Sequence, residues 1–405
     1  MTAHERPLGG RILTPFFKLL LALCGVWVVL VVIRLLFGLG AVSAQNDGYA
    51  WGIWKPLNVV TFTGIAAGAY AVGLVTYLFN EGEYHPVIRS AVMAGAMGYT
   101  LAGTSVLIDL GRWWNLWVVF WPPVWNLNSV LLEVAICVMA YTMVLWVEIG
   151  PSVLEKLESS SSAKVSGAAR RLLPMLQRAM PFVIATAILL PSMHQSSLGG
   201  LFMVAETKMH PLWHTSWLSG LFLLSCVTMG FGAVVVIENL TAMTWGKRID
   251  QKLLARLNVV PAWLSLGYVV LRLGDLAAKG RLGLIASEGL YSFFFLLELA
   301  LFLAPGLLLL SPRWRANRGK LFGTGLLLLF GGALYRFDTY LVAYQPTPGW
   351  HYFPYVREML FSVCLAAIGV TVYVLFVKLF PILSGVDEAA ATTPPRGLKA
   401  AGGAE

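Results

Sequence analysis

Charged side chains are scarce in this sequence. Asp, Glu, Lys and Arg make up 12% of the 405 residues, whereas soluble proteins average about 25%. Apolar residues account for 58% of the chain. So little charge beside so much apolar surface excludes a soluble globule and a disordered chain, and it predicts an integral membrane protein.

Cysteine is equally scarce. Cys24, Cys137, Cys226 and Cys364 each lie inside a long apolar run, and none has a C-x-x-C neighbour. Iron–sulfur clusters and structural zinc sites are usually held by closely spaced cysteines. We therefore expect no iron–sulfur cluster and no metal in this chain.

Histidine is too sparse for a haem held by two imidazoles. The sequence has six histidines, and His194 alone falls convincingly within a predicted membrane segment. His4, His85, His210, His214 and His351 fall in tails, loops or span edges. We therefore expect no haem.

Long apolar runs are what the chain has instead. A membrane-spanning helix needs about 20 predominantly apolar residues, and ten such runs can be identified. The sequence thus predicts an all-α polytopic fold, with spans at about 15–40, 54–79, 87–110, 126–149, 172–192, 213–240, 257–276, 286–310, 320–343 and 355–380.

The basic residues orient the predicted spans. With the N-terminus in the cytoplasm, eighteen Lys and Arg residues fall on the cytoplasmic side and six on the opposite side. Cytoplasmic loops carry the excess of Lys and Arg, so we expect both termini there. Ten of the fifteen tryptophans map to the outer side, which favours a face covered by lipid-lying loops or by a partner protein.

Ionisable residues within the spans are the candidate functional groups, because charge inside a bilayer is costly. Most of them fall in one leaflet, which predicts a buried polar site assembled from several helices. The outer halves of the spans hold Asp109, Glu133, His194, Arg272, Asp275, Arg336 and Asp338, whereas Glu148 and Glu238 lie near inner ends and Glu298 near mid-membrane.

Two segments sharpen this expectation. Glu133, Cys137, Tyr141 and Glu148 follow roughly one helix face over about 22 Å, which is suitable for carrying protons or, for Glu148, simply for capping the inner interface. His194 lies in the polar cluster Met193-His194-Gln195-Ser196-Ser197, which is expected to end span 5 after Pro191. A lone buried histidine is ordinarily structural, but the polar residues around His194 lead us to expect that it binds a ligand or transfers protons.

A weak internal repeat supports two related halves. Asp109-Leu110-Gly111-Arg112 is mirrored by Arg272-Leu273-Gly274-Asp275, and Leu131–Ala135 resembles Leu296–Ala300. The offsets are 275 − 109 = 166 and 298 − 133 = 165. This favours two parallel four-helix units, spans 2–5 and 6–9. Each charged tetrapeptide is expected to neutralise itself, and Arg336 with Asp338 is expected to form a structural counter-ion set.

An ordered series of motifs then carries a resemblance over nearly the whole chain. The motifs are Arg6-Pro7-Leu8-Gly9-Gly10, Phe37-Gly38-Leu39-Gly40, Tyr84-His85-Pro86, Ile108-Asp109-Leu110-Gly111-Arg112, Asn128-Ser129-Val130-Leu131-Leu132-Glu133, Met193-His194-Gln195-Ser196-Ser197, His210-Pro211-Leu212-Trp213 and Tyr352-Phe353-Pro354. The chain resembles the ten-helix membrane subunits of nickel–iron hydrogenases of the hydrogenase-2 type, traditionally called cytochrome b subunits, within the polysulfide-reductase membrane-subunit family.

This resemblance implies a haem-free, quinone-reactive subunit of a bacterial inner-membrane complex. A ferredoxin-like iron–sulfur subunit and the small and large hydrogenase subunits would cover its periplasmic face and deliver electrons from hydrogen to menaquinone or ubiquinone. By matching position, Tyr99, Glu133, His194 and Glu238 would bind quinone and transfer protons, with Asp109 and Arg112 beside that site. Glu148, Glu238 and Glu298 make up the candidate proton pathway.

The expected organisation is a cytoplasmic tail at 1–14, a membrane domain at 15–385 with bundles at about 54–192 and 213–343, and a disordered cytoplasmic tail at 386–405. Three alternatives stay open. The chain could serve a molybdenum- or polysulfide-reductase-type complex, act as a secondary transporter, or anchor a redox enzyme without reacting with quinone. The source of the protons, inner or outer, is also open, and the inner route through Glu238 is favoured.

Overall fold

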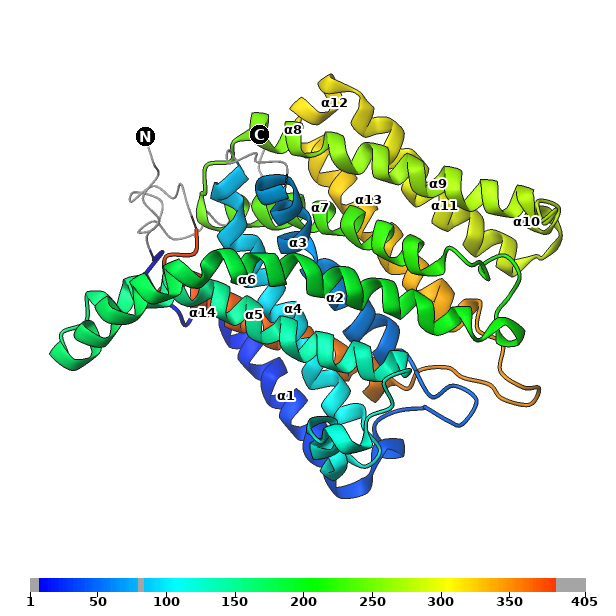
Figure 1. Cartoon of the computed structure of the whole chain (residues 1–405), viewed down its shortest axis with the longest axis horizontal. Helices are drawn as coiled ribbons and strands as arrows, with labels where there is room; N and C mark the ends of the chain where they lie inside the picture. The colour runs from blue at the N-terminus through cyan, green and yellow to red at the C-terminus, as the bar shows by residue number, and fades with distance from the viewer. Residues whose placement is uncertain (1–6, 79–83, 384–405) are drawn as a thin grey trace, which may run out of the picture.

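The computed structural model describes residues 7–78 and 84–383. Within these ranges the regular structure is helical, apart from an isolated antiparallel bridge between Met209 and Tyr344. Ten helical segments are long and apolar enough to cross a membrane, and they run side by side in Figure 1. The prediction of an all-α membrane protein with ten spans is confirmed.

Several spans contain short irregular pieces, so the ten spans comprise more than ten helices. The elements that form the spans are α1 (Pro15–Phe37), η2 (Lys55–Thr61), α2 (Phe62–Ala66), α3 (Gly68–Gly73), η3 (Leu74–Leu78), α4 (His85–Asp109), α5 (Val130–Glu158), α6 (Ala163–Met203), α7 (Leu218–Trp245), α8 (Gln251–Leu257), α9 (Val259–Ala278), α11 (Leu290–Leu310), α13 (Arg318–Phe337), η8 (Asp338–Val342) and α14 (Val356–Leu379). The short connecting turns are η1 (Leu39–Ala41), η5 (Trp113–Phe120), η6 (Pro122–Val124), η7 (Glu206–Lys208), α10 (Leu284–Ser287) and α12 (Pro312–Ala316).

The fifth span is longer than predicted. Helix α6 has 41 residues, about 60 Å at 1.5 Å per residue, or about twice the hydrocarbon thickness of a bilayer. Pro191 lies inside this helix and does not end it, because neighbouring groups in a membrane protein can satisfy the freed backbone. The expectation that the His194 cluster ends the helix is therefore wrong: His194 is an interior helical residue.

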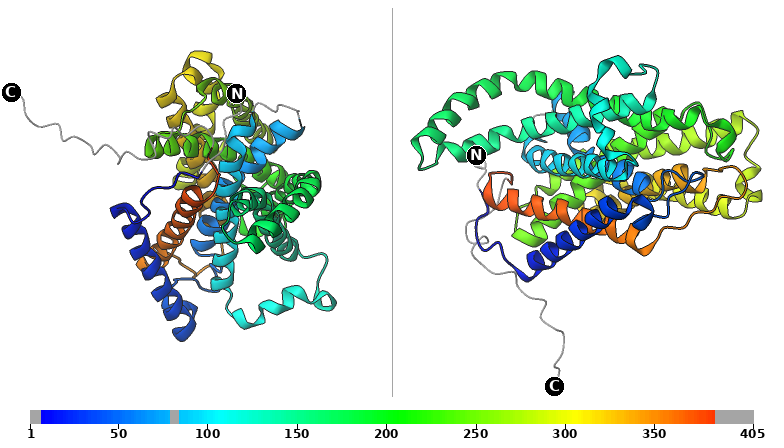
Figure 2. Two further views of the ribbon diagram at one scale, coloured as in Figure 1. Left: turned by 90° about the vertical axis from the view of Figure 1, so that its left-hand side faces the viewer. Right: turned by 90° about the horizontal axis from the view of Figure 1, so that it is seen from below.

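The two ends of the described chain meet at one end of the bundle. The backbone N–H of Leu8 donates to the carbonyl of Val377 at 3.2 Å, and that of Gly9 donates to Lys378 at 3.0 Å. Helix α1 packs along α14 (Figure 2). An even number of spans places both ends on the same side, and these contacts bring them together. The predicted disordered tail at 386–405 lies outside the described residues.

Two groups of helices meet along α7. Helices α4 and α6 both pack on α5, while α9 and α13 both pack on α11. Helix α7 contacts α6 and α3 on one side and α9 and α13 on the other. A Cβ added at Gly230 would lie 2.7 Å from the carbonyl oxygen of Ala67, so glycine is needed for this close approach. The division into repeat units at 54–192 and 213–343 remains a prediction.

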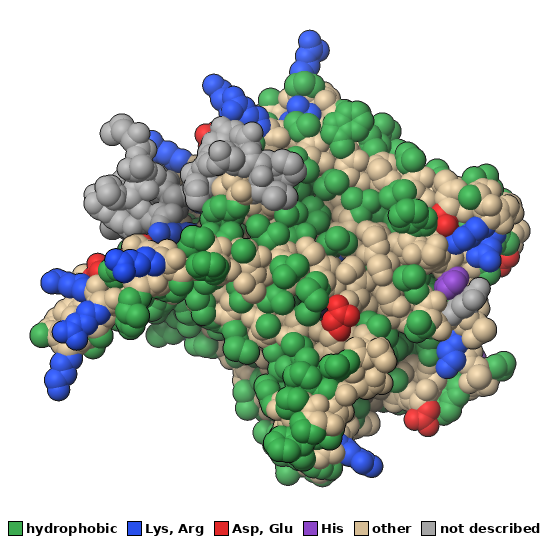
Figure 3. Space-filling view, in the orientation of Figure 1, with side chains coloured by type: hydrophobic (Ala, Val, Ile, Leu, Met, Phe, Trp, Pro, Cys, Tyr) green, Lys and Arg blue, Asp and Glu red, His purple; other side chains and the backbone are tan. Residues whose placement is uncertain are grey.

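The molecular surface matches a membrane environment. In the face shown in Figure 3, hydrophobic side chains cover the middle, whereas the blue Lys and Arg side chains gather mainly at the margins, including the projecting turn between α5 and α6. The two helices that flank this turn carry Lys156 on α5 and Lys164, Arg170, Arg171 and Arg178 on α6. Lipid-facing apolar surface with charge at the ends is what a spanning bundle requires.

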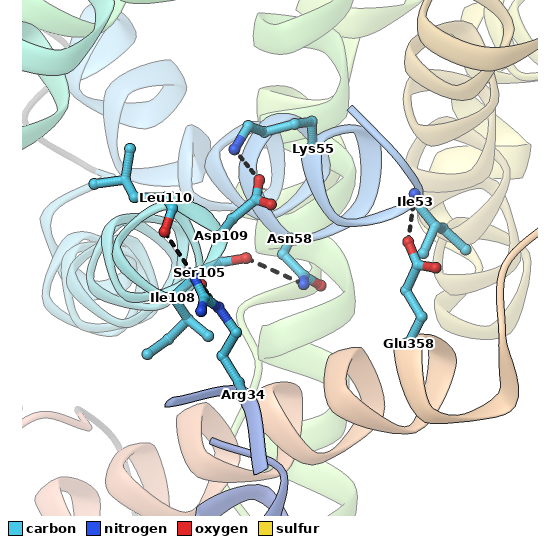
Figure 4. A network of polar contacts seen from close by, with 9 residues as sticks. All are labelled: Arg34, Ile53, Lys55, Asn58, Ser105, Ile108, Asp109, Leu110 and Glu358. Carbon is cyan, nitrogen blue, oxygen red and sulfur yellow. Dashed lines mark hydrogen bonds and ion pairs between the residues drawn. The ribbon is translucent and has the colours of Figure 1, made fainter. Parts of the chain in front are cut away.

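Buried Glu358 organises the end of the bundle opposite the termini, which we call the distal end (segments 38–54, 110–129, 204–217, 279–289 and 343–355). Its Oε1 accepts from the backbone N–H of Ile53 at 3.2 Å and from the Tyr352 hydroxyl at 2.7 Å. Its Oε2 accepts from the N–H of Ala44 at 2.9 Å. One carboxylate therefore fastens two connecting segments to the start of α14; Figure 4 shows its contact with Ile53.

Buried Arg34 has a similar role at the end of α4. Its Nε donates to the carbonyl of Ile108 at 2.8 Å and its Nη2 donates to the carbonyl of Leu110 at 2.5 Å. Terminal helix carbonyls lack intrahelical partners and carry partial negative charge. The guanidinium satisfies both needs, which explains an arginine inside the apolar first span (Figure 4).

We predict that Glu358→Gln lowers the free energy of unfolding by about 2 kcal/mol, the typical value of a hydrogen bond to a charged group. The NH2 group of glutamine would face one of the N–H or O–H donors that now donate to the carboxylate, so that hydrogen bond would be lost. The measurement is a denaturant titration of the purified protein in detergent micelles. Asp47→Asn, an exposed carboxyl in the same connecting segment, is the control, and equal losses in both variants would contradict the assignment.

Candidate functional site

A buried aromatic and imidazole pair lies at the centre of the first helix group. Tyr99 of α4 and His194 of α6 are both fully buried, with ring centroids 5.6 Å apart. Tyr141 of α5 packs edge-on against Tyr99 at 4.5 Å. The structure therefore brings together two residues, from different helices, that the sequence singled out as site candidates.

These side chains hold hydrogen-bonding atoms that the described protein does not satisfy. The Tyr99 hydroxyl and both ring nitrogens of His194 are buried without a hydrogen-bond partner among the described residues, although the Gln195 side chain lies near the hydroxyl. Buried polar groups are nearly always hydrogen-bonded in native proteins. Unsatisfied donors and acceptors gathered at one place indicate a site for a polar ligand.

A buried cation lies beside this pair. The Arg336 guanidinium of α13 donates to the carbonyls of Val60 at 3.0 Å and Gly332 at 2.8 Å, and more weakly to Ser225 Oγ at 3.4 Å and Gln195 Oε1 at 3.3 Å. Gln195 in turn donates to Thr63 Oγ1 at 3.1 Å. Every one of these acceptors is neutral, so Arg336 supplies positive charge next to Tyr99 and His194.

The expected pairing of Arg336 with Asp338 is not seen among the contacts of the described chain. Residues two positions apart lie on nearly opposite faces of a helix. The Arg336 guanidinium faces α6 and α7 through Gln195 and Ser225, whereas Asp338 interacts with Glu298 of α11.

Glu133 approaches the same region from the first turn of α5. Its Oε1 accepts from the Ser197 hydroxyl of α6 at 2.8 Å. Ser197 lies three residues after His194, on the same helix face, and the Glu133 side chain is half-buried. Helix α6 thus aligns His194, Gln195 and Ser197 toward α4, α13 and α5.

A small pocket lies beside this group, toward the end that holds the termini. Its walls include Tyr70, Tyr141 and Glu148, and Tyr141 also contacts Tyr99. The Tyr70 hydroxyl is 2.7 Å from Ser192 Oγ. The full lining is Ala69, Tyr70, Gly73, Tyr77, Ile88, Tyr141, Glu148, Ile184, Ala187 and Ile188. Glu148 therefore lines a pocket of which one wall, Tyr141, is also a neighbour of Tyr99.

Glu238 lies apart from these residues. Ser225, which contacts Arg336, precedes it on α7 by 238 − 225 = 13 residues, about 20 Å along a helix. The Glu238 carboxylate is buried with Lys247, at 2.6 Å between Oε2 and Nζ. It also accepts from the Ser90 hydroxyl at 2.7 Å.

The charged tetrapeptides do not neutralise themselves as expected. Asp109 pairs with Lys55 (Figure 4), and Arg112 is exposed, because the chain leaves the helix after Asp109 and loses the helical spacing. In α9, Asp275 pairs with Lys279 at 2.9 Å. Arg272 points inward, with its Nε 3.3 Å from Glu298 Oε1.

Sequence reasoning missed three partners of the candidate residues. Gln195 stood in the quoted His194 motif without a role, Lys247 was counted with the loop basic residues, and Tyr268 was not singled out. Only Gln195 could have been found from the local sequence, because it adjoins His194. Lys247 contacts Glu238, and Tyr268 contacts Glu298, only through the packing of the folded chain.

Comparisons with known proteins cover most of the chain. The family model described as "Polysulphide reductase, NrfD" matches residues 41–346. An Escherichia coli (strain K12) protein named "Probable Ni/Fe-hydrogenase 2 b-type cytochrome subunit" is 38% identical over 95% of this chain and 96% of its own length. A Nitratidesulfovibrio vulgaris (Hildenborough) protein named "Menaquinone reductase, integral membrane subunit" is 25% identical over 85% of this chain and 86% of its own length.

The buried Glu238–Lys247 pair gives a stability prediction. Lys247→Met leaves the carboxylate buried without its cation, and we expect the free energy of unfolding to fall by about 3–5 kcal/mol. Adding Glu238→Gln removes the unpaired charge and is expected to restore most of the loss. Denaturant titration in detergent provides the measurement.

The control for this experiment is Lys279→Met, which breaks the more exposed pair with Asp275. We expect it to cost about 0–1 kcal/mol. A double variant as unstable as Lys247→Met alone would show that the ion pair is not the cause.

Proposed function

The chain belongs to the polysulphide reductase NrfD family, and on that basis we propose that it passes electrons to membrane quinone as the integral membrane subunit of a respiratory nickel–iron hydrogenase complex. The motif resemblance to this family is confirmed by the match over residues 41–346. The hydrogenase assignment is supported by the 38% identity to the E. coli hydrogenase 2 subunit over nearly the full length of both chains.

The observation that carries the proposal is the unsatisfied buried group of Tyr99 and His194 beside Arg336. A quinone head group presents two carbonyl oxygens, which gain negative charge as electrons arrive. The Tyr99 hydroxyl and one His194 N–H would donate to these oxygens. The Arg336 cation would stabilise the developing negative charge in a site that excludes water.

Quinone reduction consumes two electrons and two protons, and the chain offers two routes for the protons. Glu133, bonded to Ser197, is placed to relay a proton from the distal end as a general acid. On the side of the termini, Glu148 and Tyr141 line a small pocket, and Tyr141 contacts Tyr99. We favour the second route, in which Glu133 still passes the proton to the quinone as the general acid and the buried Glu238–Lys247 pair tunes the charge at the end that holds the termini. Asp109 and Arg112 would lie near the quinone site without contacting the quinone.

The partner enzyme is proposed to bind at the distal end. There, η5 and the residues after it expose Trp113, Trp114, Trp117 and Trp121. Aromatic residues are enriched both at protein interfaces and at the membrane boundary. We propose that a ferredoxin-like iron–sulfur subunit and the hydrogenase small and large subunits cover this end in the periplasm, with both termini in the cytoplasm of a bacterial inner membrane.

Quinone is the substrate in this proposal, and neither haem, an iron–sulfur cluster nor a metal ion in this chain is needed for it. Within residues 7–78 and 84–383, no group of three His, Cys, Asp or Glu residues is placed to hold a metal ion. A second candidate function is that of membrane subunit for a different electron-donating enzyme. It is favoured by the N. vulgaris relative named as a menaquinone reductase subunit.

We predict that Glu133→Gln lowers hydrogen-dependent quinone reduction by about 10²–10⁴-fold, the usual contribution of a positioned general acid or base. The complex, purified with its partners, is reconstituted into menaquinone-containing liposomes, and reduction of an artificial dye by hydrogen is measured in parallel. Dye reduction is expected to be unchanged, because it does not require the quinone site.

Glu158→Gln, at the opposite end of the same helix, is the matched control and is expected to retain full activity. A membrane-potential dye in the same liposomes reports whether the protons come from the cytoplasmic side. If the wild-type complex reduces the artificial electron-accepting dye with hydrogen but reduces no quinone, the proposed function is wrong.

A further inference from the structure

A second group of buried ionisable residues lies between α9, α11 and η8. Glu298 and Asp338 are both fully buried. Glu298 Oε1 accepts from the Tyr268 hydroxyl at 2.5 Å and from Arg272 Nε at 3.3 Å. Its Oε2 accepts from the indole N–H of Trp213 at 2.8 Å. Three donors from α9 and the segment before α7 therefore converge on one carboxylate.

Asp338, in contrast, has no ion-pair partner among the contacts of the described chain. Its segment, η8, contacts helix α11, which carries Glu298, and the two carboxyls would repel each other if both were ionised. Neither oxygen of Asp338 has a hydrogen-bond donor in the described part of the chain. It is the first residue of η8, a π-helical segment, and such segments often occur at functional sites. An ionised Asp338 would place a second negative charge beside Glu298.

The charged and titratable groups facing this pair come from three elements. Helix α9 supplies Tyr268 and Arg272, α11 supplies Glu298 itself, and α13 supplies Tyr335. Arg336, also on α13, donates to Val60, Gly332, Ser225 and Gln195. Arg272 thus neutralises one carboxylate, and the second needs another positive charge.

Two further buried polar atoms point to a ligand at this place. Arg272 Nη2 and the Tyr335 hydroxyl have no hydrogen-bond partner in the ranges that the structure describes. The Arg272 guanidinium lies 5.7 Å from the centre of the Tyr335 ring. The group therefore combines two acids, one cation and unused hydrogen-bonding capacity.

We infer that Glu298 and Asp338 share one bound proton, which makes this group a second protonation site, separate from the Tyr99–His194 site. With the proton bound, Arg272, Glu298 and Asp338 sum to zero charge. On release the proton leaves for the aqueous phase and the group becomes singly negative. A metal cation fits poorly, because N–H and O–H donors already occupy the Glu298 oxygens and a guanidinium lies at the site.

The access route begins at the distal surface. Glu288, with 35% of its side chain exposed, lies 3.4 Å from His210 Nε2. The His210 ring stacks on the Tyr291 ring, with centroids 4.1 Å apart. Trp213 lies three residues after His210, and its indole N–H donates to Glu298.

His210 has the properties of a proton carrier on this route. Its Nδ1 accepts the N–H of Leu212, which assigns the proton to Nε2. Burial lowers the pKa of His210, so the ring is neutral at pH 7 and able to pass a proton on.

The test uses infrared absorption of the purified complex, in which a protonated carboxyl and a carboxylate give different bands. We expect the wild-type-minus-Asp338→Asn spectrum to show one lost protonated carboxyl band that shifts in D2O. Glu298→Gln is expected to lose the same band, because Asp338 would then ionise against Arg272. Asp275→Asn, which alters the more exposed pair with Lys279, is expected to keep it.

A difference spectrum for Asp338→Asn that shows a lost carboxylate band would overturn the inference, as would a protonated band that persists in both variants. Asp338→Asn is also expected to unfold at the wild-type temperature, since a neutral amide replaces a neutral acid. These measurements require no quinone, so their outcome does not depend on whether the proposed function is correct.

The access route has its own measurement. His210→Phe is expected to slow the D2O shift of the band at least tenfold, whereas His214→Phe in the same segment is expected to leave the rate unchanged. Equal rates in the wild type and His210→Phe would exclude this route.

Discussion

Compensation of buried charge is the constraint on which this structure depends. A membrane interior offers no water to solvate an ion, so each buried charge must find its partner within the protein. The chain meets this demand in distinct ways. Arg34 bonds the last carbonyls of α4, Glu358 collects donors from two connecting segments, and Glu238 holds Lys247. These contacts join segments distant in sequence, so they fix the arrangement of the bundle.

Several buried polar atoms of the described chain have no hydrogen-bond partner, and in two places such atoms gather around ionisable side chains. At the first, Tyr99 and His194 have unused hydrogen-bonding atoms and Arg336 faces only neutral acceptors. At the second, Asp338 adds an acid to an already balanced Glu298–Arg272 pair. Incomplete satisfaction costs stability, and natural proteins accept that cost mainly at functional sites. The same physical argument therefore locates both the proposed quinone site and the inferred protonation site.

Helix α13 and η8 connect the two groups. Arg336 and Asp338 are two residues apart, so one faces the Tyr99–His194 site and the other faces Glu298. Tyr335 packs on Phe222, whose ring lies 5.8 Å from the Arg336 guanidinium. A change of charge at one site is therefore felt at the other over a short distance in a medium of low dielectric constant. In the proposed scheme, this arrangement would link electron arrival at the quinone electrostatically to proton binding at the second site.

Composition and hydrophobic runs determined the ten spans and the all-α class, because a bilayer imposes length and apolarity on each helix independently of its neighbours. Charges at membrane depth also identified Glu133, His194 and Glu298 as candidates. Local spacing, however, suggested ion pairs within Asp109–Arg112 and Arg272–Asp275, and a helix end near Pro191. Tertiary structure decided otherwise: Lys55 meets Asp109, Arg272 meets Glu298, and α6 continues to Met203. Partner choice is set by which helix faces touch, and that depends on packing between segments up to hundreds of residues apart.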